Sequence, residues 1–263
     1  MNYTAKQFHL HYIAQYRLIV KSTYQYDTLY VLDEQDQLLV YMKFESNHPN
    51  EEALKLLSLP FQQVYVSVPT NHVTFIPETL FQASDLDKYA AFMENPGREL
   101  THTELDFLNI HALYQYDVLL LQRWKSLFPE ATFIPEFQLN LLQARPHIPL
   151  KGEVLGLVMH QATTAMFLFI NGQFQFYNSF EITGEDDLSY YLLNVFEQFS
   201  LRDQVSKILV SGTDIEESYI EKLQRFSASD VQRLEASKPA LALDQLERSI
   251  SASYLLDLPT CVS

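Results

Sequence analysis

The chain has one cysteine, Cys261, among 263 residues. An intrachain disulfide is therefore excluded, and so is a zinc site that needs two or more thiolates. Long apolar runs are also lacking: the longest uninterrupted ones, such as AMFLFI (165–170), have about six residues, whereas a membrane span needs roughly 20. Residues 1–20 show no signal-peptide pattern. These absences predict a cytoplasmic protein that does not enter a membrane.

Basic residues are scarce. Lys and Arg number 18 against 33 Asp and Glu, which gives a net charge of −15, and acidic residues outnumber basic ones in both halves of the chain. Phosphate backbones are bound by clustered Lys and Arg side chains, so we expect no nucleic-acid partner. The same reasoning excludes binding to an anionic membrane surface.

Glycine is scarce as well, with six in the chain and no two adjacent. Neither the P-loop nor the dinucleotide-binding pattern is present, and there is no GxSxG nucleophile elbow. No known catalytic motif therefore marks a reaction.

The apolar pattern that is present repeats once. Three strand-like segments, a helix and a further strand occupy residues 17–68, and the same order recurs over 154–211. Antiparallel strands followed by a helical crossover indicate an α/β fold with mixed sheets covered by helices. RPHIPLKG (145–152), with two prolines and a glycine, is the best boundary, so we predict domains at 1–148 and 149–263, each with a five-stranded sheet.

Several local signals set the ends of elements. Asn50 and Asp117 are expected to cap helices, and Asn171-Gly172 predicts a type I′ hairpin turn because both positions tolerate positive φ. Between the repeats, strands are expected at 72–77 and 106–114. Helices are expected at 84–94, 117–128 and 137–144.

The acidic run Glu185-Asp186-Asp187 has two readings. Thr183 with Asp186 three residues later is close to a capping box, and carboxylates in a first helical turn are favoured by the helix dipole. The alternative is a metal site. Three consecutive carboxylates point around a helix and cannot all converge on one ion, so the helix start is favoured.

The segment KILVSGTDIEESYIEKL (207–223) predicts a buried strand that leads through Ser211, Gly212 and Thr213 into a helix. Ligands in α/β folds often sit at such strand ends, where backbone N–H groups face an anion. A plain turn, in which Gly212 supplies flexibility and Thr213 caps the helix, explains the same residues. Both readings stay open on the sequence.

Four phrases carry a resemblance to a known bacterial family, and together they span most of the chain. They are FIPETLF (75–81), LFPEATFIPE (127–136), NGQFQFYNSFEITGEDDLSYYLL (171–193) and ILVSG (208–212). The chain resembles the family catalogued as domain of unknown function 3822. The resemblance implies two tandem actin-like (ribonuclease H-like) domains.

Active actin-like proteins, by the same resemblance, bind ATP and magnesium between the domains through glycine-containing acidic turns. The corresponding turns here, KSTYQYD (21–27) and MHQATTA (159–165), contain no glycine, and the adenosine-side segment has only Gly212. A Cβ in such a turn blocks close approach of backbone to phosphate. Asp27 is the only nearby candidate for magnesium, and it stands late in its turn.

Two functions follow from this pattern. We expect a degenerate, non-catalytic interaction or regulatory module with a protein partner and no cofactor. The alternative is an ATP-binding protein or weak ATPase with magnesium, which would use Thr163 and Thr164 for phosphate and Ser211, Gly212 and Thr213 for the nucleoside. A small-molecule kinase ranks lower, because it needs the same phosphate turns.

Overall fold

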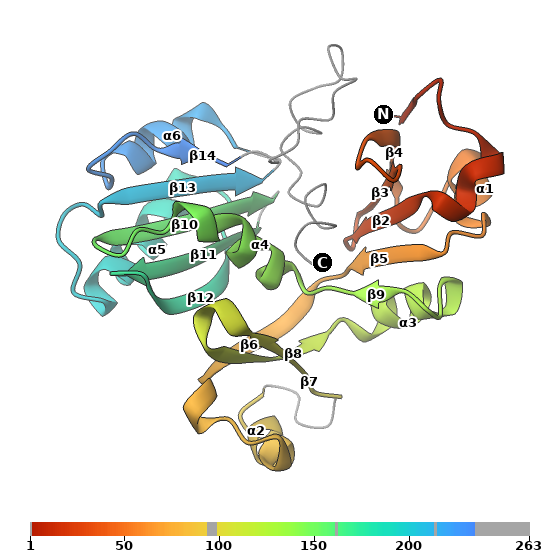
Figure 1. Cartoon of the computed structure of the whole chain (residues 1–263). Helices are drawn as coiled ribbons and strands as arrows, with labels where there is room; N and C mark the ends of the chain where they lie inside the picture. The colour runs from red at the N-terminus through yellow and green to blue at the C-terminus, as the bar shows by residue number, and fades with distance from the viewer. Residues whose placement is uncertain (1, 94–98, 161–162, 213–214, 235–263) are drawn as a thin grey trace. The chain divides into compact units, whose positions relative to one another are not determined.

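A computed structural model describes residues 2–93, 99–160, 163–212 and 215–234 (Figure 1). Its contacts separate two compact units, with the division in the chain between Leu139 and Asn140. Each unit is described by itself below. Among the described residues, no helix has the length and apolar character needed to cross a membrane.

The first unit is built on a six-stranded mixed sheet with the strand order β1-β4-β3-β2-β5-β9. Strands β2, β3 and β4 are antiparallel neighbours, whereas β5 and β9 continue the sheet in parallel with β2. Consecutive residues of β2 and β3 are buried, which is the pattern of strands covered on both faces. The strands are β1 (Asn2–Thr4), β2 (Arg17–Ser22), β3 (Tyr26–Leu32), β4 (Leu38–Glu45), β5 (Gln63–Ser67) and β9 (Thr132–Phe133).

Two helices of this unit start at the residues that the sequence predicts. Helix α1 (Glu51–Leu57) is capped by Asn50, whose side chain accepts a hydrogen bond from the backbone N–H of Ala53 at 2.8 Å. Helix α3 (Val118–Leu127) is capped in the same way by Asp117. Trp124, on α3, is fully buried.

A separate three-stranded sheet interrupts the first unit between β5 and α3. It has the order β6-β8-β7 and is fully antiparallel. Its elements are β6 (Thr70–Pro77), β7 (Thr101–Leu105), β8 (Ile110–Tyr116), the short helix α2 (Leu86–Ala90) and 3-10 turns at Glu78–Leu80, Ala83–Asp85 and Asp106–Leu108. The expected strand at 106–114 therefore starts too early, because Asn109 takes a left-handed conformation that separates the 3-10 turn from β8.

The second unit contains a five-stranded sheet with the order β12-β11-β10-β13-β14. Its strands are β10 (Glu153–His160), β11 (Thr163–Ile170), β12 (Gln173–Glu181), β13 (Lys207–Gly212) and β14 (Gln232–Arg233). Helix α5 (Glu185–Gln198) lies behind the sheet in Figure 1, and its Leu188, Leu192 and Val195 join the buried cluster on that face. Helix α6 (Glu217–Gln224) follows β13, and α4 (Glu136–Ala144) spans the division between the units.

The repeated order of elements is present in the structure. In the first unit β2, β3 and β4 are antiparallel and β5 returns parallel to β2; in the second, β10, β11 and β12 are antiparallel and β13 returns parallel to β10. The predicted turn at Asn171-Gly172 is confirmed by φ values of 51° and 77°.

The prediction of one five-stranded sheet in each half needs correction. Among the described residues, the second unit has five strands, but the first has six and a further sheet of three, because β1 joins β4 at the edge and β6, β7 and β8 pair only with one another. The assignment of 1–148 and 149–263 to two tandem domains, and their origin by duplication, stay predictions.

Candidate functional site

Four of the five residues predicted to contact a nucleotide lie at one end of the five-stranded sheet. Gly212 on β13 and Thr164 on β11 both pair with Met159 on β10, so the three form one row across neighbouring strands. Ser211 pairs with Val158 in the next row, and Thr163, the first residue of β11, pairs with His160, the last residue of β10. Thr213 lies outside the described residues.

The hydroxyl groups of this end differ in exposure. Thr164 is 3% exposed and Ser211 is 2% exposed, so both face the interior. Thr163 is exposed. Of the described hydroxyl groups predicted to meet a ligand, only that of Thr163 is therefore accessible from solvent.

The backbone conformation and the surroundings of position 212 require a glycine. Its φ of +126° lies where side chains other than glycine are rarely found, and a Cβ there would stand 1.9 Å from the carbonyl oxygen of Met159. At this point the backbones of β13 and β10 lie too close together for a side chain at position 212. Strand packing therefore requires a glycine at this position whether or not a ligand binds.

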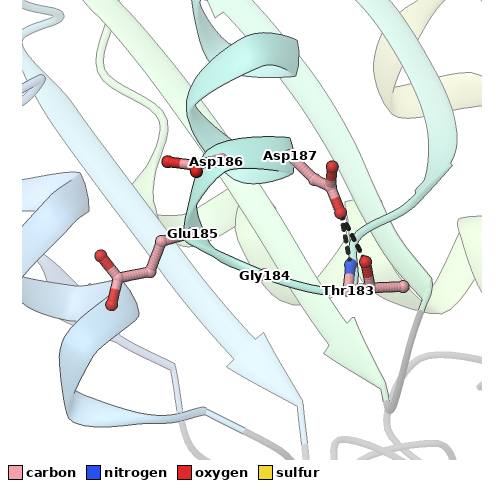
Figure 2. Close-up of a pocket in the computed structure, with 5 residues that line it drawn as sticks. All are labelled: Thr183, Gly184, Glu185, Asp186 and Asp187. Atoms are coloured by element: carbon pink, nitrogen blue, oxygen red, sulfur yellow. Dashed lines mark hydrogen bonds between the residues drawn. The ribbon is translucent and has the colours of Figure 1, made fainter.

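Carboxylates gather at the same end of the sheet. Glu181, the last residue of β12, pairs with Thr163, and the chain then continues through Thr183 into the first turn of α5. Figure 2 shows the residues 183–187, which line a surface hollow of about 400 Å³.

The Tyr219 hydroxyl on α6 lies within electrostatic reach of several carboxylates. Its pKa is raised, first by burial and then by the negative charges of Glu216, Glu185 and Asp187. Lys222 supplies one opposing charge, with its Nζ 3.8 Å from Glu185. Carboxylates therefore outnumber basic groups among the charges near Tyr219.

The acidic run is the start of a helix, as the sequence predicts, but the capping partner differs. Gly184, in an extended conformation, is the N-cap, and Glu185 is the first helical residue. Asp187, rather than Asp186, reaches back: its Oδ2 accepts hydrogen bonds from the backbone N–H and the hydroxyl of Thr183, at 2.9 and 2.7 Å (Figure 2). The hydrogen bond from the Thr183 hydroxyl, then that from its N–H, lowers the pKa of Asp187.

We expect Asp187→Asn to lower the melting temperature by about 1 °C or slightly more, because the stronger charge-assisted hydrogen bonds to Thr183 are lost. A carboxyl whose pKa is lowered on folding stabilises above its unfolded pKa and loses that effect as the pH falls through its folded pKa. The difference from wild type should therefore be present at pH 7 and vanish well below pH 3.8, the ordinary value. Calorimetry across pH measures both.

Asp186→Asn is the matched control, since no described hydrogen bond involves the Asp186 side chain and it shares the first turn of α5. An equal loss of stability in the two variants at pH 7 would show that the helix dipole, rather than the contact with Thr183, accounts for the effect.

The corresponding turn of the first unit, between β2 and β3, is held by hydrogen bonds between its own residues. The N–H of Thr23 donates to the carbonyl of Tyr26 at 3.0 Å, and the Thr23 hydroxyl donates to the same carbonyl at 2.8 Å. The hydroxyl also accepts from the N–H of Tyr26 at 3.0 Å. Tyr24, at the tip, donates from its hydroxyl to the capping carboxylate Asp117 of α3 at 3.1 Å.

Asp27 is the acidic side chain of this turn and is completely buried. Its Oδ1 accepts a hydrogen bond from the Ser22 hydroxyl at 2.6 Å, and its Oδ2 forms an ion pair with the Arg123 guanidinium of α3. Both carboxylate oxygens are therefore engaged by protein groups. Sequence reasoning singled out Asp27 but not Arg123, because nothing local links two residues 96 positions apart.

Among the described residues, no three His, Cys, Asp or Glu side chains are grouped so that they could hold a metal ion. The carboxylates in the first turn of α5 therefore form no such group. The position of the Asp187 side chain is explained by its hydrogen bonds to Thr183.

A family model described as "Protein of unknown function (DUF3822)" matches residues 5–229. The chain belongs to this family. The match covers both units of the DUF3822 chain, from before β2 to the end of α6. No curated protein matches this chain.

Two solved structures share the fold of this DUF3822 chain. A Bacteroides thetaiotaomicron protein with an actin-like ATPase fold and unknown function is 19% identical, covers 86% of this chain and 93% of its own length, and has a TM-score of 0.68. A chain of the PilM–PilN type IV pilus biogenesis complex is 10% identical, covers 94% and 97%, and has a TM-score of 0.53. At these identities the likeness shows the actin-like ATPase fold alone.

The fold is compatible with ATP, but the described residues of the DUF3822 chain fit MgATP poorly. Asp27 has no free oxygen for magnesium or its water shell. The space that a missing Cβ leaves at Gly212 is filled by the Met159 carbonyl. Thr163, the exposed described residue of the second turn, pairs with an acidic residue, Glu181, on the neighbouring strand.

Proposed function

We propose that this DUF3822 chain is a non-catalytic protein of the actin-like ATPase fold that acts as an interaction or regulatory module. One observation carries the proposal. The carboxylate of Asp27, beside the turn of the first unit, forms an ion pair with the Arg123 guanidinium and accepts a hydrogen bond from the Ser22 hydroxyl. An acidic side chain that is buried and fully paired cannot position a magnesium ion without first breaking an ion pair. Both turns also lack the glycine that would admit a phosphate group.

A protein partner is the second part of this proposal. The fold is shared with a chain of the PilM–PilN type IV pilus biogenesis complex, in which proteins assemble with one another. The acidity of this chain, with a net charge of −15, favours a partner that carries basic groups and disfavours nucleic acid or an anionic membrane.

We also propose that the protein is cytoplasmic and that its two domains span residues 1–148 and 149–263.

The alternative, an ATP-binding protein or weak ATPase, is favoured by one observation. Thr163, Thr164, Ser211 and Gly212 do lie together at one end of a sheet, as a nucleotide-binding edge would require. In this alternative Thr163 supplies the phosphate contact, because it alone among the described hydroxyl groups of that set is exposed.

Calorimetric titration with MgATP separates the two proposals. We expect no saturable heat, with any dissociation constant weaker than about 100 μM, roughly −5.5 kcal/mol. We also expect no rise in melting temperature with MgATP, since a ligand that binds only the folded state must raise it. An actin-like ATPase of known activity, titrated under the same conditions, is the positive control.

Binding tighter than about 100 μM that is lost in Thr163→Val would overturn the non-catalytic proposal in favour of the alternative. Thr163→Val is the proper variant because it keeps the size of an exposed side chain. Gly212→Val is unsuitable, since the added side chain would collide with the Met159 backbone and unfold the site whether or not a nucleotide binds.

A further inference from the structure

Strand β12 borders the five-stranded sheet, and its sequence lacks two of the usual protections of an edge, Lys and Pro. Among the described residues it pairs only with β11. Edge strands are normally guarded against further pairing by Lys, Pro or short length. The nine residues of β12, QFQFYNSFE, include no Lys and no Pro, and the only charge is that of Glu181 at the end.

Aromatic side chains on this edge remain partly open. Phe176 and Phe180 lie on the face covered by α5, with ring centroids 5.1 Å from Phe199 and 4.5 Å from Tyr191. Both are only half-buried, since no further strand covers their outer side among the described residues. A strand added along β12 would complete their burial.

The direction of one backbone group defines the open side. The N–H of Ser179 donates to the Oδ1 of the neighbouring Asn178 at 2.9 Å. It therefore points away from β11, and in a paired edge a carbonyl of the added strand takes the place of the Asn178 side chain as its acceptor. Because backbone N–H groups alternate in direction along a strand, the N–H of Asn178 faces β11. The pleat is regular from Phe176 onward, after the bulge opposite Leu168 and Phe169.

We propose that β12 pairs with β12 of a second copy of this chain, antiparallel and with the two-fold axis at Asn178. This register sets Phe176 opposite Phe180 of the second copy, and symmetry makes the same aromatic pair twice. Asn178 stands opposite Asn178 in a close, non-hydrogen-bonded pair. Glu181 falls opposite the bulged residue Gln175, outside the regular part of the strand, so no like charges are opposed. The two five-stranded sheets become one continuous sheet.

The neighbouring helix is also compatible with a second copy. Contact between Tyr191 and Phe180 fixes the side of α5 that faces β12. Residues three and seven further along, Asn194 and Gln198, share that side and are uncharged, whereas Asp187, four residues before Tyr191, shares it and is charged. The Asn194–Gln198 part of α5 could therefore face a second copy without opposing carboxylates, and Asp187 marks the acidic end of that side.

The test is sedimentation velocity of the full chain from about 1 to about 100 μM, the range in which modest affinities become visible. The wild type should shift from monomer to dimer across it. Asn178→Lys and Asn178→Glu should each remain monomeric, because each places two like charges directly opposite one another. An equimolar mixture of these two variants should form a one-to-one dimer, since the charges are then complementary.

Gln173→Lys is the matched control. It adds the same charge to the same strand but lies outside the paired residues, so it should dimerise like the wild type. Unchanged melting temperatures of the monomeric samples show that the variants are folded.

Three outcomes would overturn the proposal: a wild type that stays monomeric throughout, position 178 variants that dimerise like the wild type, or a mixture that fails to associate. Capture of an extended peptide by a monomeric wild type would assign the edge to a different occupant and is also contrary. None of these results depends on whether ATP binds, so this proposal and the proposed function can fail separately.

Discussion

Replacing Arg123 by methionine is expected to lower the free energy of unfolding by about 3 kcal/mol, measured by urea unfolding. The substitution leaves the Asp27 carboxylate buried with only the Ser22 hydroxyl as a described partner. Removing one member of a buried pair strands a charge in a medium that solvates it poorly. Methionine keeps the aliphatic part of the contact with Trp124, whose ring centre lies 4.9 Å from the guanidinium carbon, so the loss reports mainly the charge.

Two further variants make this prediction specific. Lys125→Met removes a charge from an exposed position on the same helix and should cost less than about 0.5 kcal/mol. Adding Asp27→Asn to Arg123→Met should recover much of the lost stability, because an amide can be buried with Ser22 as its partner at lower cost. If Arg123→Met were as stable as Lys125→Met, the ion pair would not hold the turn, and the main support for a non-catalytic role would be removed.

The ion pair also links fold and function in the first unit. It anchors β3 to α3, and the Tyr24 contact with Asp117 anchors the tip of the same turn to the same helix. A turn held at both points is suited to a fixed surface. It is poorly suited to opening and closing around a nucleotide, which would require both contacts to break.

Local signals account for what the sequence predicted well. Asn50 and Asp117 cap their helices because the required donors lie three residues away, and Asn171-Gly172 turns the chain within its own hairpin. Strands with consecutive apolar residues were recognised because both faces are buried. Each of these features can be seen within a window of a few residues.

Contacts between distant residues account for what was missed. The β7 sequence THTEL has no apolar alternation, and only its pairing with β8 makes it a strand. Nothing near Asp27 in the chain indicates Arg123. At Gly212 the sequence indicates either a ligand contact or a flexible turn, and it does not reveal the Met159 carbonyl on the neighbouring strand, which itself requires a glycine there.

Gly212→Ala is expected to lower the free energy of unfolding by about 3 kcal/mol, the combined effect of a strained φ and an added methyl with no space. The Cβ would stand within 3 Å of three backbone atoms of Met159, and backbone within a paired strand cannot move aside as a side chain can. The measurement is urea unfolding in the absence of any nucleotide.

Gly184→Ala provides the comparison, because its added Cβ would have no atom within 4 Å and its φ of −169° is extended. It should cost less than about 1 kcal/mol, the small difference between Gly and Ala at a helix N-cap. A Gly212→Ala protein as stable as Gly184→Ala would mean that β13 has room beside Met159, and the glycine would then need a ligand to explain it. A large loss in Gly212→Ala alone assigns the residue to the packing of β13 against β10, and leaves Thr163 as the variant that can report on a nucleotide.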